Sequence, residues 1–351
     1  MLKNNKANDA LIMLCYTCAF GAFGAFFRWL QMQVARDTET GMINPSILNI
    51  LLPLLIVAAA VVLWLRTRKL TDDQTVFPTG MSEALRGLSI LYIIFAWIIA
   101  ALAVLGGIMT IVETSLDSLR TMYVLVAVLG MLSGLSFPLI CSASRSHYSP
   151  SLVSIFMALP ILMYCVWLIA SYRSNANNPN VWMFAIEILA ICCAILALFY
   201  VAGYAFGRPD PHKACYLSLL GAFMCITTLA DSRHMGLELI ILATVGMLLM
   251  YSWLIIKNRC AKEDLPPETE KIASPEPETK SDDEAEDTVI EPGPDEAAPE
   301  PTIEAPVRKA KPQSADDEVE EIIKEYNKEL NSTKQVLKIL IPALIIVSLI
   351  R

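Results

Sequence analysis

The sequence predicts an all-α fold: a polytopic transmembrane helical bundle of about eight spans, followed by a disordered acidic tail and a short amphipathic helix. Three observations lead to this prediction. Eight long apolar runs fill the first 257 residues. Hydrophobic residues make up 55% of the chain, and the mean hydropathy is +0.51, more than one soluble core of this size can bury. From Ala261 onward the composition becomes acidic and rich in proline.

The apolar runs have the length of membrane spans, because a hydrocarbon core about 30 Å thick is crossed by roughly 20 residues of helix. Backbone groups in lipid must be hydrogen-bonded within the segment, which favours helices, and the runs lack the alternation of transmembrane strands. The expected spans are residues 10–30, 46–65, 87–111, 121–142, 151–171, 181–204, 214–231 and 235–256. They define a transmembrane domain over residues 1–260.

Three prolines fall inside these spans. Pro53, Pro138 and Pro160 are expected to kink their helices, since proline lacks the N–H donor and clashes with the preceding turn. The longest expected inside connection, 66–86, is interpreted as a solvated loop that begins with anchoring arginines.

Small residues recur at the spacing that brings helix backbones close together. Gly130 and Gly134 form one GxxxG pair in the fourth span, and Gly203 and Gly207 form another at the end of the sixth. We expect these glycines to serve contacts within the chain, because an eight-helix bundle has many internal interfaces.

The orientation follows from the positive-inside rule, which predicts a cytoplasmic N-terminus. Eleven basic residues then lie in inside segments and five in outside segments. The inside set is Lys3, Lys6, Arg66, Arg68, Lys69, Arg86, Arg145, Arg208, Lys213, Lys257 and Arg259, and the outside set is Arg28, Arg36, Arg120, Arg173 and Arg233. Eight spans return residues 258–335 to the cytoplasm. Short loops without a folded outer domain indicate a bacterial plasma membrane.

The acidic character of the chain belongs to its tail. Residues 1–260 hold 16 basic and 12 acidic residues, whereas residues 261–335 hold 9 and 23. The segment 261–315 contains ten prolines and almost no aromatic residues, so it is expected to be a disordered linker. The sequence offers no basic face of the kind that binds nucleic acid.

The segment 316–335 differs, because its apolar residues fall on one stripe of an α-helix. It is expected to be a docking helix that orders against an unknown cytoplasmic protein. The stripe consists of Val319, Ile322, Ile323, Tyr326 and Leu330. The last segment, 336–351, is apolar but short for a span, so it is expected to associate with the membrane or to form a ninth span.

Ionisable residues inside spans are costly and are functional candidates by default. Arg28, Glu113, Glu187 and Glu238 come from the first, third, sixth and eighth spans. A helical rise of about 1.5 Å per residue places all four in the outer leaflet or at its edge. They predict one outward-facing polar cavity in which Arg28 pairs with Glu187 or Glu238 first and with Glu113 next. The alternative is a structural Arg–Glu pair that holds the bundle together.

Catalytic signatures are missing from the sequence. It contains no HExxH, GxSxG, P-loop or dinucleotide-binding glycine motif. The three histidines fall in separate loops and cannot form one metal site. We therefore expect no enzymatic activity, no cofactor and no metal.

The run Gly21-Ala22-Phe23-Gly24-Ala25-Phe26-Phe27-Arg28-Trp29 resembles the G-x-x-G-A-x-x-R-[YW] opening of the small bacterial fluoride-channel family. That family implies a four-span subunit in a dual-topology dimer. Here the match covers nine residues, the expected spans are twice as many, and the later Asn and Phe motifs of the family are missing. The run is therefore interpreted as helix packing. The whole chain more generally resembles uncharacterised multi-pass membrane proteins of Gram-positive anaerobic bacteria, which implies no activity.

Two functional hypotheses from different classes remain. The first is a non-enzymatic anchor or sensor that recruits a cytoplasmic partner through its tail. The second is a transporter or channel that uses the outer-leaflet Arg/Glu cluster. A cavity that reaches Glu187 would favour the second hypothesis, whereas a dry, fully packed bundle would exclude it.

Overall fold

The computed structural model describes residues 2–34, 47–70, 75–87, 90–114, 120–143, 150–176 and 181–261. These ranges fold into helices joined by short connections, which confirms the predicted helical polytopic bundle. The long helices are α1 (Leu2–Val34), α2 (Leu48–Arg68), α4 (Ile90–Glu113), α5 (Arg120–Ala143), α6 (Pro150–Asn175), α7 (Val181–Ala202), α8 (Pro211–Thr228) and α9 (Met235–Lys257).

Two small elements complete the described ranges. The helix α3 spans Met81–Ala84, and the strand β1 (Thr75–Val76) pairs antiparallel with β2 (Cys260–Ala261). The predictions for the linker 261–315 beyond Ala261, for the docking helix 316–335 and for the end segment 336–351 lie outside the described residues.

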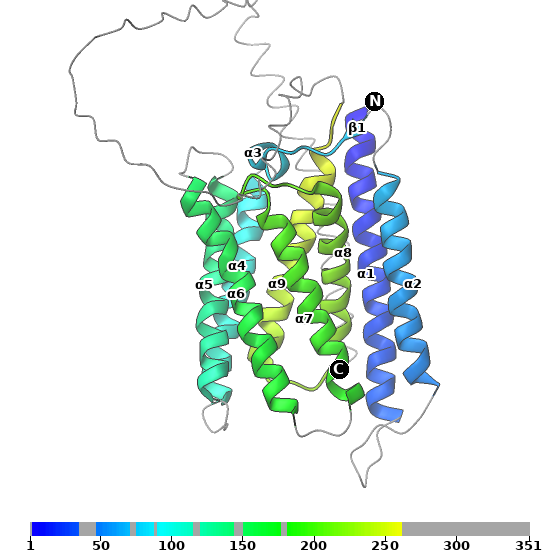
Figure 1. Cartoon of the computed structure of the whole chain (residues 1–351), viewed down its shortest axis with the longest axis vertical. Coiled ribbons are helices and arrows are strands. Elements are labelled where there is room, and N and C mark those ends of the chain that lie inside the picture. Colours follow the sequence, from blue (N-terminus) through cyan, green and yellow to red (C-terminus); the bar gives the residue numbers. More distant parts are fainter. Residues whose placement is uncertain are drawn as a thin grey trace, which may run out of the picture. The chain divides into compact units, whose positions relative to one another are not determined.

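Seven of the eight long helices in the described ranges have the length and apolar composition of membrane spans. The exception is α8, which begins with Pro211-His212-Lys213 and is 18 residues long. It nevertheless packs lengthwise against α1, α7 and α9 (Figure 1). The chain is therefore an integral membrane protein in which α8, the remaining long helix, is placed by its packing against neighbouring helices.

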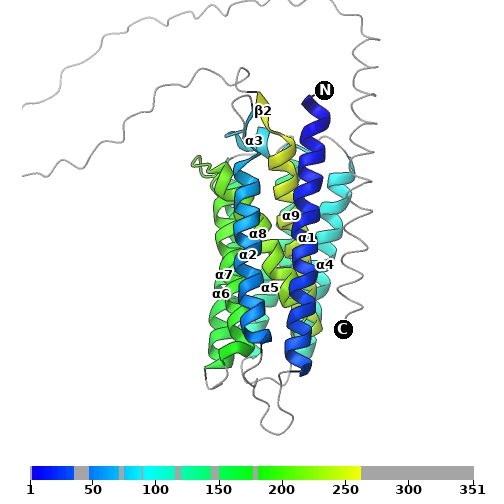
Figure 2. The ribbon, with the colours of Figure 1, turned by 90° about the vertical axis from the view of Figure 1, so that its right-hand side faces the viewer.

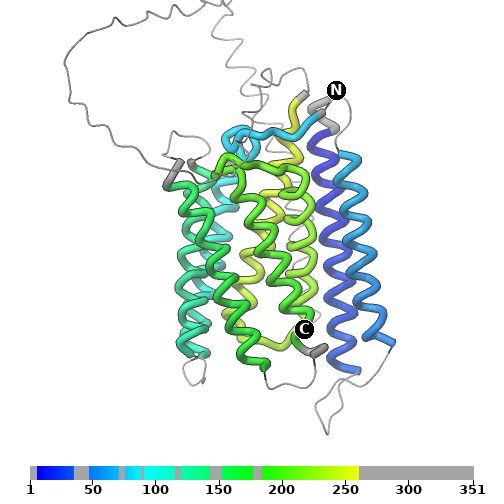
Figure 3. Tube along the Cα trace, in the orientation of Figure 1, coloured from blue at the N-terminus to red at the C-terminus, as the bar shows by residue number. Residues whose placement is uncertain are grey.

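The start of α1 and the end of α9 lie at the same end of the bundle, which we call the proximal end. Lys6 Nζ donates to the backbone oxygen of Arg259 at 2.5 Å, and Asp9 Oδ2 lies 2.6 Å from Arg259 Nη2. The chain thus crosses the bundle an even number of times before Lys257, as Figure 3 allows the reader to follow. We call the opposite end, where α1 ends and α9 begins, the distal end.

The helix α9 forms the centre of the bundle. Over its most apolar window 83% of the residues are buried, compared with 22% for α2. It packs against α4, α8 and α1. Its apolar residues are spread around the whole helix, as expected of a helix surrounded by protein. The helices α1 and α2 lie together on one side of the bundle (Figure 2).

Glycines permit the closest helix contacts. A Cβ on Gly21 would lie 2.8 Å from Ile226 Cγ2, and one on Gly24 would collide with Thr227, so the first span approaches α8 along its two glycines. This contact explains the glycines of the fluoride-channel-like run as packing within the chain. In α5, a Cβ on Gly134 would collide with Ala103 of α4.

The pair Gly203 and Gly207 has another role, and its assignment to helix packing was wrong. The helix α7 ends at Ala202, before both residues. Gly203 donates to the backbone oxygen of Phe199 in α7 and accepts from the backbone N–H of Arg208, and Gly207 has a φ of 69°, which favours glycine. The pair therefore forms the turn between α7 and α8.

The prediction of a solvated loop over 66–86 was also wrong. Arg66 and Arg68 belong to the last turn of α2. The part 75–87 packs onto the proximal end of the bundle, where Phe77 and Leu85 are buried. The loop makes this contact through apolar side chains that are spaced among charged ones. The prediction considered only the charged residues of the loop and therefore missed the contact.

The residues that follow α9 are built into the same proximal layer. Arg259 is 6% exposed and donates to the backbone oxygens of Leu70 and Ile256 as well as to Asp9. Asn258 Nδ2 donates to the backbone oxygens of Ala84 and Arg86, each at 3.0 Å. We call this set the Arg259 junction: it ties the point where the tail begins to α1 and to the loop before α4.

The predicted orientation is testable at exposed serines of the two ends. Ser174 lies at the distal end of α6, and Ser82 lies in α3 at the proximal end; both are exposed. In intact cells, Ser174→Cys should react with a membrane-impermeant thiol reagent, and Ser82→Cys should react only after permeabilisation. The unmodified chain gives the background from its native cysteines. The reverse pattern would overturn the cytoplasmic placement of the N-terminus.

Candidate functional site

The distal end of the bundle contains a buried ion pair. Arg28, near the end of α1, is fully buried, and its Nε lies 2.5 Å from Oδ1 of Asp231 in the connection between α8 and α9. Arg28 Nη1 donates to Gln31 Oε1 at 2.8 Å. A guanidinium that keeps its charge away from water needs such acceptors, so this contact fixes α1 against the end of α8.

The pair is part of a chain of polar contacts that crosses the distal end. On one side, Gln31 Nε2 donates to Asn49 Oδ1 in α2 at 2.8 Å. On the other, Asp231 Oδ2 accepts from Arg233 Nη2 at 2.7 Å. Arg233 Nε then lies 3.7 Å from Glu187 Oε2 in α7. Asp231 therefore bridges two arginines, and the contacts join α2, α1, the α8–α9 connection and α7.

Glu113 approaches the same connection from α4. Its Oε2 accepts from the backbone N–H of Gly236 at 3.1 Å and lies 4.0 Å from His234 Nδ1. Gly236 is required there because a Cβ would collide with the backbone nitrogen of Thr110. The first turn of α9 also carries Glu238. Acidic side chains from α4, α7 and α9 thus surround the residues 231–234.

A cavity of about 590 Å³ opens beside this network. Its charged and ionisable lining comes from Glu187, Asp231, Arg233 and His234, and Ser171, Ser174 and Asn175 of α6 add uncharged polar groups. The remaining lining residues are Met32, Tyr123, Phe184, Ser232 and Leu237. A volume of this order suits a small molecule, and the lining provides a few polar groups among apolar ones, as ligand sites do.

The cavity has an excess of negative charge around its guanidinium. Burial lowers the pKa of Arg233, but the carboxylates of Glu187, Asp231 and Glu238 together raise it above its usual value. Arg233 is therefore charged at any physiological pH. The four acidic residues Glu113, Glu187, Asp231 and Glu238 and the two cations Arg28 and Arg233 together carry a formal charge of −2 when His234 is neutral.

The structure corrects the predicted contacts of the four candidate residues, and of the four only Glu187 is among the residues that line the cavity. The structure brings Arg28, Glu113, Glu187 and Glu238 to the distal end, and the cavity reaches Glu187. The ion-pair partner of Arg28 is Asp231, however, and not one of the glutamates. Glu187 lies instead beside Arg233.

Sequence reasoning missed Asp231 and placed Arg233 among ordinary loop charges. Asp231 was the last residue of the expected span 214–231, and in the structure it belongs, with Arg233, to the short connection that follows α8. The available signal was the density of charge in Asp231-Ser232-Arg233-His234 next to two helices that carry glutamates. Their burial follows from the folding of this connection into the bundle, where Asp231 is 6% exposed.

These features define a multi-pass helical membrane protein with a charged cavity at one end of its bundle. Comparison of the chain with protein-family models, with curated proteins and with solved structures found no match.

Replacing Arg28 by Met should lower the free energy of unfolding by about 3–5 kcal/mol, because a buried ion pair that loses one partner leaves the other charge uncompensated. Asp231 keeps its contact with Arg233, so the loss should lie at the lower part of that range. Adding Asp231→Asn to Arg28→Met should cost less than the sum of the two single substitutions. Unfolding in mixed micelles measures these differences.

The matched control is Arg66→Met, which removes an arginine that contacts the hydroxyl and ring of Tyr16 at the exposed proximal end of α2. Its effect should stay below about 1 kcal/mol. Strictly additive losses at positions 28 and 231 would show that the two side chains do not stabilise the bundle as a pair.

Proposed function

We propose that the chain is a transporter or channel of the cell membrane that takes up a small cation through the distal cavity. The observation that carries the proposal is the cavity itself, which reaches Glu187 and is flanked by four carboxylates and two guanidinium groups. The excess of carboxylates favours a positively charged occupant. The volume of about 590 Å³ favours an amine of metabolite size.

The two ends of the bundle differ in a way that supports transport. The distal end holds the polar cavity, whereas at the proximal end the folded loop 75–87 and the Arg259 junction pack over the ends of α1 and α9. A site that is accessible from one side only is what a carrier needs in one of its alternating states. The positive-inside rule places the distal end outside the cell.

A second candidate is the non-enzymatic anchor or sensor that recruits a cytoplasmic protein through residues 316–335. The Arg259 junction favours this function, because it connects the first residues of the tail to α1 and to the loop before α4. A rearrangement of the bundle would therefore act directly on the base of the tail. Neither candidate requires an enzymatic activity or a cofactor.

The first candidate predicts binding that depends on Glu187. Choline, agmatine and arginine are suitable probes, and at least one of them should raise the thermal unfolding temperature of the full chain and enter proteoliposomes. Glu187→Gln should weaken the binding at least about tenfold, since interactions with charged groups contribute about 1.5–3 kcal/mol. Glutamate should have no effect on the unfolding temperature.

The control is Glu83→Gln, which removes an exposed carboxylate from the first turn of α3 at the proximal end. It should leave binding and uptake unchanged. Equal binding by the wild type and Glu187→Gln, or a preference for anions, would contradict the proposal of a cation site.

The second candidate predicts that the tail is needed in the cell but not for the fold. A chain that ends after Cys260 should insert into the membrane with an unchanged unfolding temperature and should fail to complement a deletion strain. Cation uptake by this shortened chain in proteoliposomes should match that of the full chain. Full complementation by the shortened chain would exclude recruitment through the tail and leave the transport proposal standing.

A further inference from the structure

Three buried polar atoms without a hydrogen-bond partner belong to residues that line the distal cavity. Within the described ranges, these atoms are Nε and Nη1 of Arg233 and Oγ of Ser171. The side chain of Arg233 is 7% exposed, and Ser171 is 2% exposed. Burying a donor without an acceptor is costly, so the three atoms point to a ligand that supplies an acceptor.

The guanidinium of Arg233 has more N–H groups than its neighbours accept. A guanidinium carries five N–H donors and no acceptor. Arg233 Nη2 donates to Asp231 Oδ2 at 2.7 Å, whereas Nε lies 3.7 Å from Glu187 Oε2, which is too long for a hydrogen bond. In the part of the chain that the structure describes, the N–H groups of Nε and Nη1 therefore have no acceptor.

The same cavity also offers a partner for a cation. Glu187 lines it, and the side chain of Glu187 is 18% exposed. The four acidic residues and two arginines of the distal end sum to a formal charge of −2. A ligand with a carboxylate must therefore carry more positive than negative charge, because the carboxylates around the cavity would otherwise repel it.

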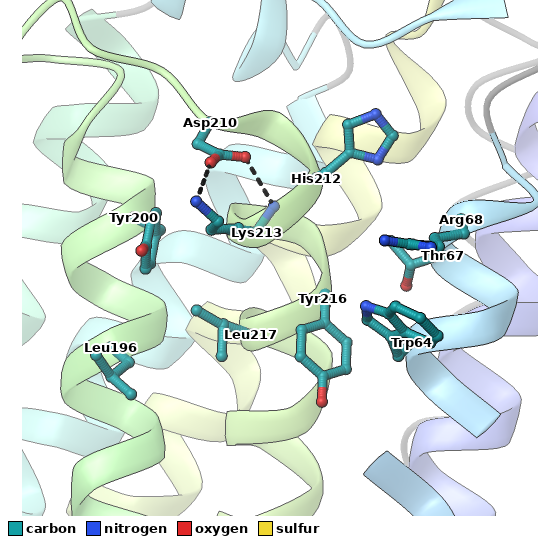
Figure 4. Close-up of a pocket in the computed structure, with 10 residues that line it drawn as sticks. All are labelled: Trp64, Thr67, Arg68, Leu196, Tyr200, Asp210, His212, Lys213, Tyr216 and Leu217. Atoms are coloured by element: carbon teal, nitrogen blue, oxygen red, sulfur yellow. Dashed lines mark hydrogen bonds and ion pairs between the residues drawn. The ribbon is translucent and has the colours of Figure 1, made fainter. Parts of the chain in front are cut away.

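A second cavity, of about 740 Å³, lies at the proximal end between α2, α7 and α8 and lacks this feature. There, Asp210 accepts from the backbone N–H of Lys213 at 3.2 Å and pairs with its ammonium at 2.8 Å (Figure 4). Thr67 Oγ1 donates to the backbone oxygen of Leu63. Among the described residues that line this cavity, none contributes a buried polar atom without a partner. The unpartnered donors are therefore a feature of the distal cavity that the proximal one does not share.

We propose that the distal cavity binds a basic amino acid, which carries one carboxylate and two cationic groups. The carboxylate of the ligand accepts from Arg233 and Ser171, and one of its cationic groups lies against Glu187. Because the donors are buried, binding turns the side chains of Arg233 and Ser171 toward the ligand. The inference rests on the proposed uptake of a small cation, and it names the substrate class of that same cavity.

Two pairs of ligands that differ in the carboxylate test the proposal. Arginine and agmatine share their cationic groups, as do lysine and cadaverine, but only the two amino acids carry a carboxylate. Titration calorimetry on the full chain in detergent micelles measures the four affinities. Each amino acid should bind at least about tenfold more tightly than its decarboxylated counterpart, because hydrogen bonds between charged groups are among the stronger ones.

Ser171→Ala should reduce the preference for arginine over agmatine several-fold and leave the affinity for agmatine unchanged. Ser218→Ala is the matched control, because Ser218 Oγ is also buried without a partner among the described residues but lies outside the distal cavity. Arg233→Lys keeps a positive charge beside Asp231 and should also reduce the preference. Unchanged unfolding temperatures establish that each variant is folded, and the comparison of the ligand pairs on the wild-type chain stands without any variant.

Agmatine that binds as tightly as arginine, and does so in a way that depends on Glu187, would overturn this inference and leave the proposed cation uptake standing. A preference for arginine that survives in both Ser171→Ala and Arg233→Lys would overturn the assignment of the carboxylate to these two side chains. If none of the four ligands binds, this inference fails, and the binding of choline then decides the proposed uptake of cations.

Discussion

The buried Arg28–Asp231 ion pair is the contact on which the distal half of this bundle depends. A guanidinium cannot readily lose its proton, so inside a membrane it must be given an acceptor. That acceptor comes from a different part of the chain, 203 residues away. The pair can form only if α1 lies directly against the end of α8, and Gly21 and Gly24 permit this approach by leaving room for Ile226 and Thr227. Helix packing and charge pairing therefore require each other here.

The same aspartate connects stability with the site. One oxygen of Asp231 accepts from Arg28 and the other from Arg233, which in turn lies beside Glu187 in the cavity wall. A solute that competes for Arg233 or Glu187 would therefore change the balance of charge around Asp231 and the hold of α1 on α8. Through these contacts, a ligand bound in the cavity could change how tightly α1 packs against α8.

The proximal end is built on a different principle. There, Arg259 and Asn258 bind mainly backbone oxygens, of Leu70, Ile256, Ala84 and Arg86, and so fasten a loop and the base of the tail to the bundle. Two other cations of this end, Arg68 and Lys213, lie against aromatic rings.

The sequence by itself determined the all-α fold, the position of all eight long helices and the gathering of Arg28, Glu113, Glu187 and Glu238 at one end. Apolar length and depth along a helix are local properties, so they can be read from the order of residues. The tertiary structure alone decided that Asp231 pairs with Arg28, that Phe77 and Leu85 are buried, and that Gly203 and Gly207 form a turn. These features depend on how connections fold against helices far away in the chain. Local composition predicts that such connections are solvated, because it contains no information about which distant residues they will contact.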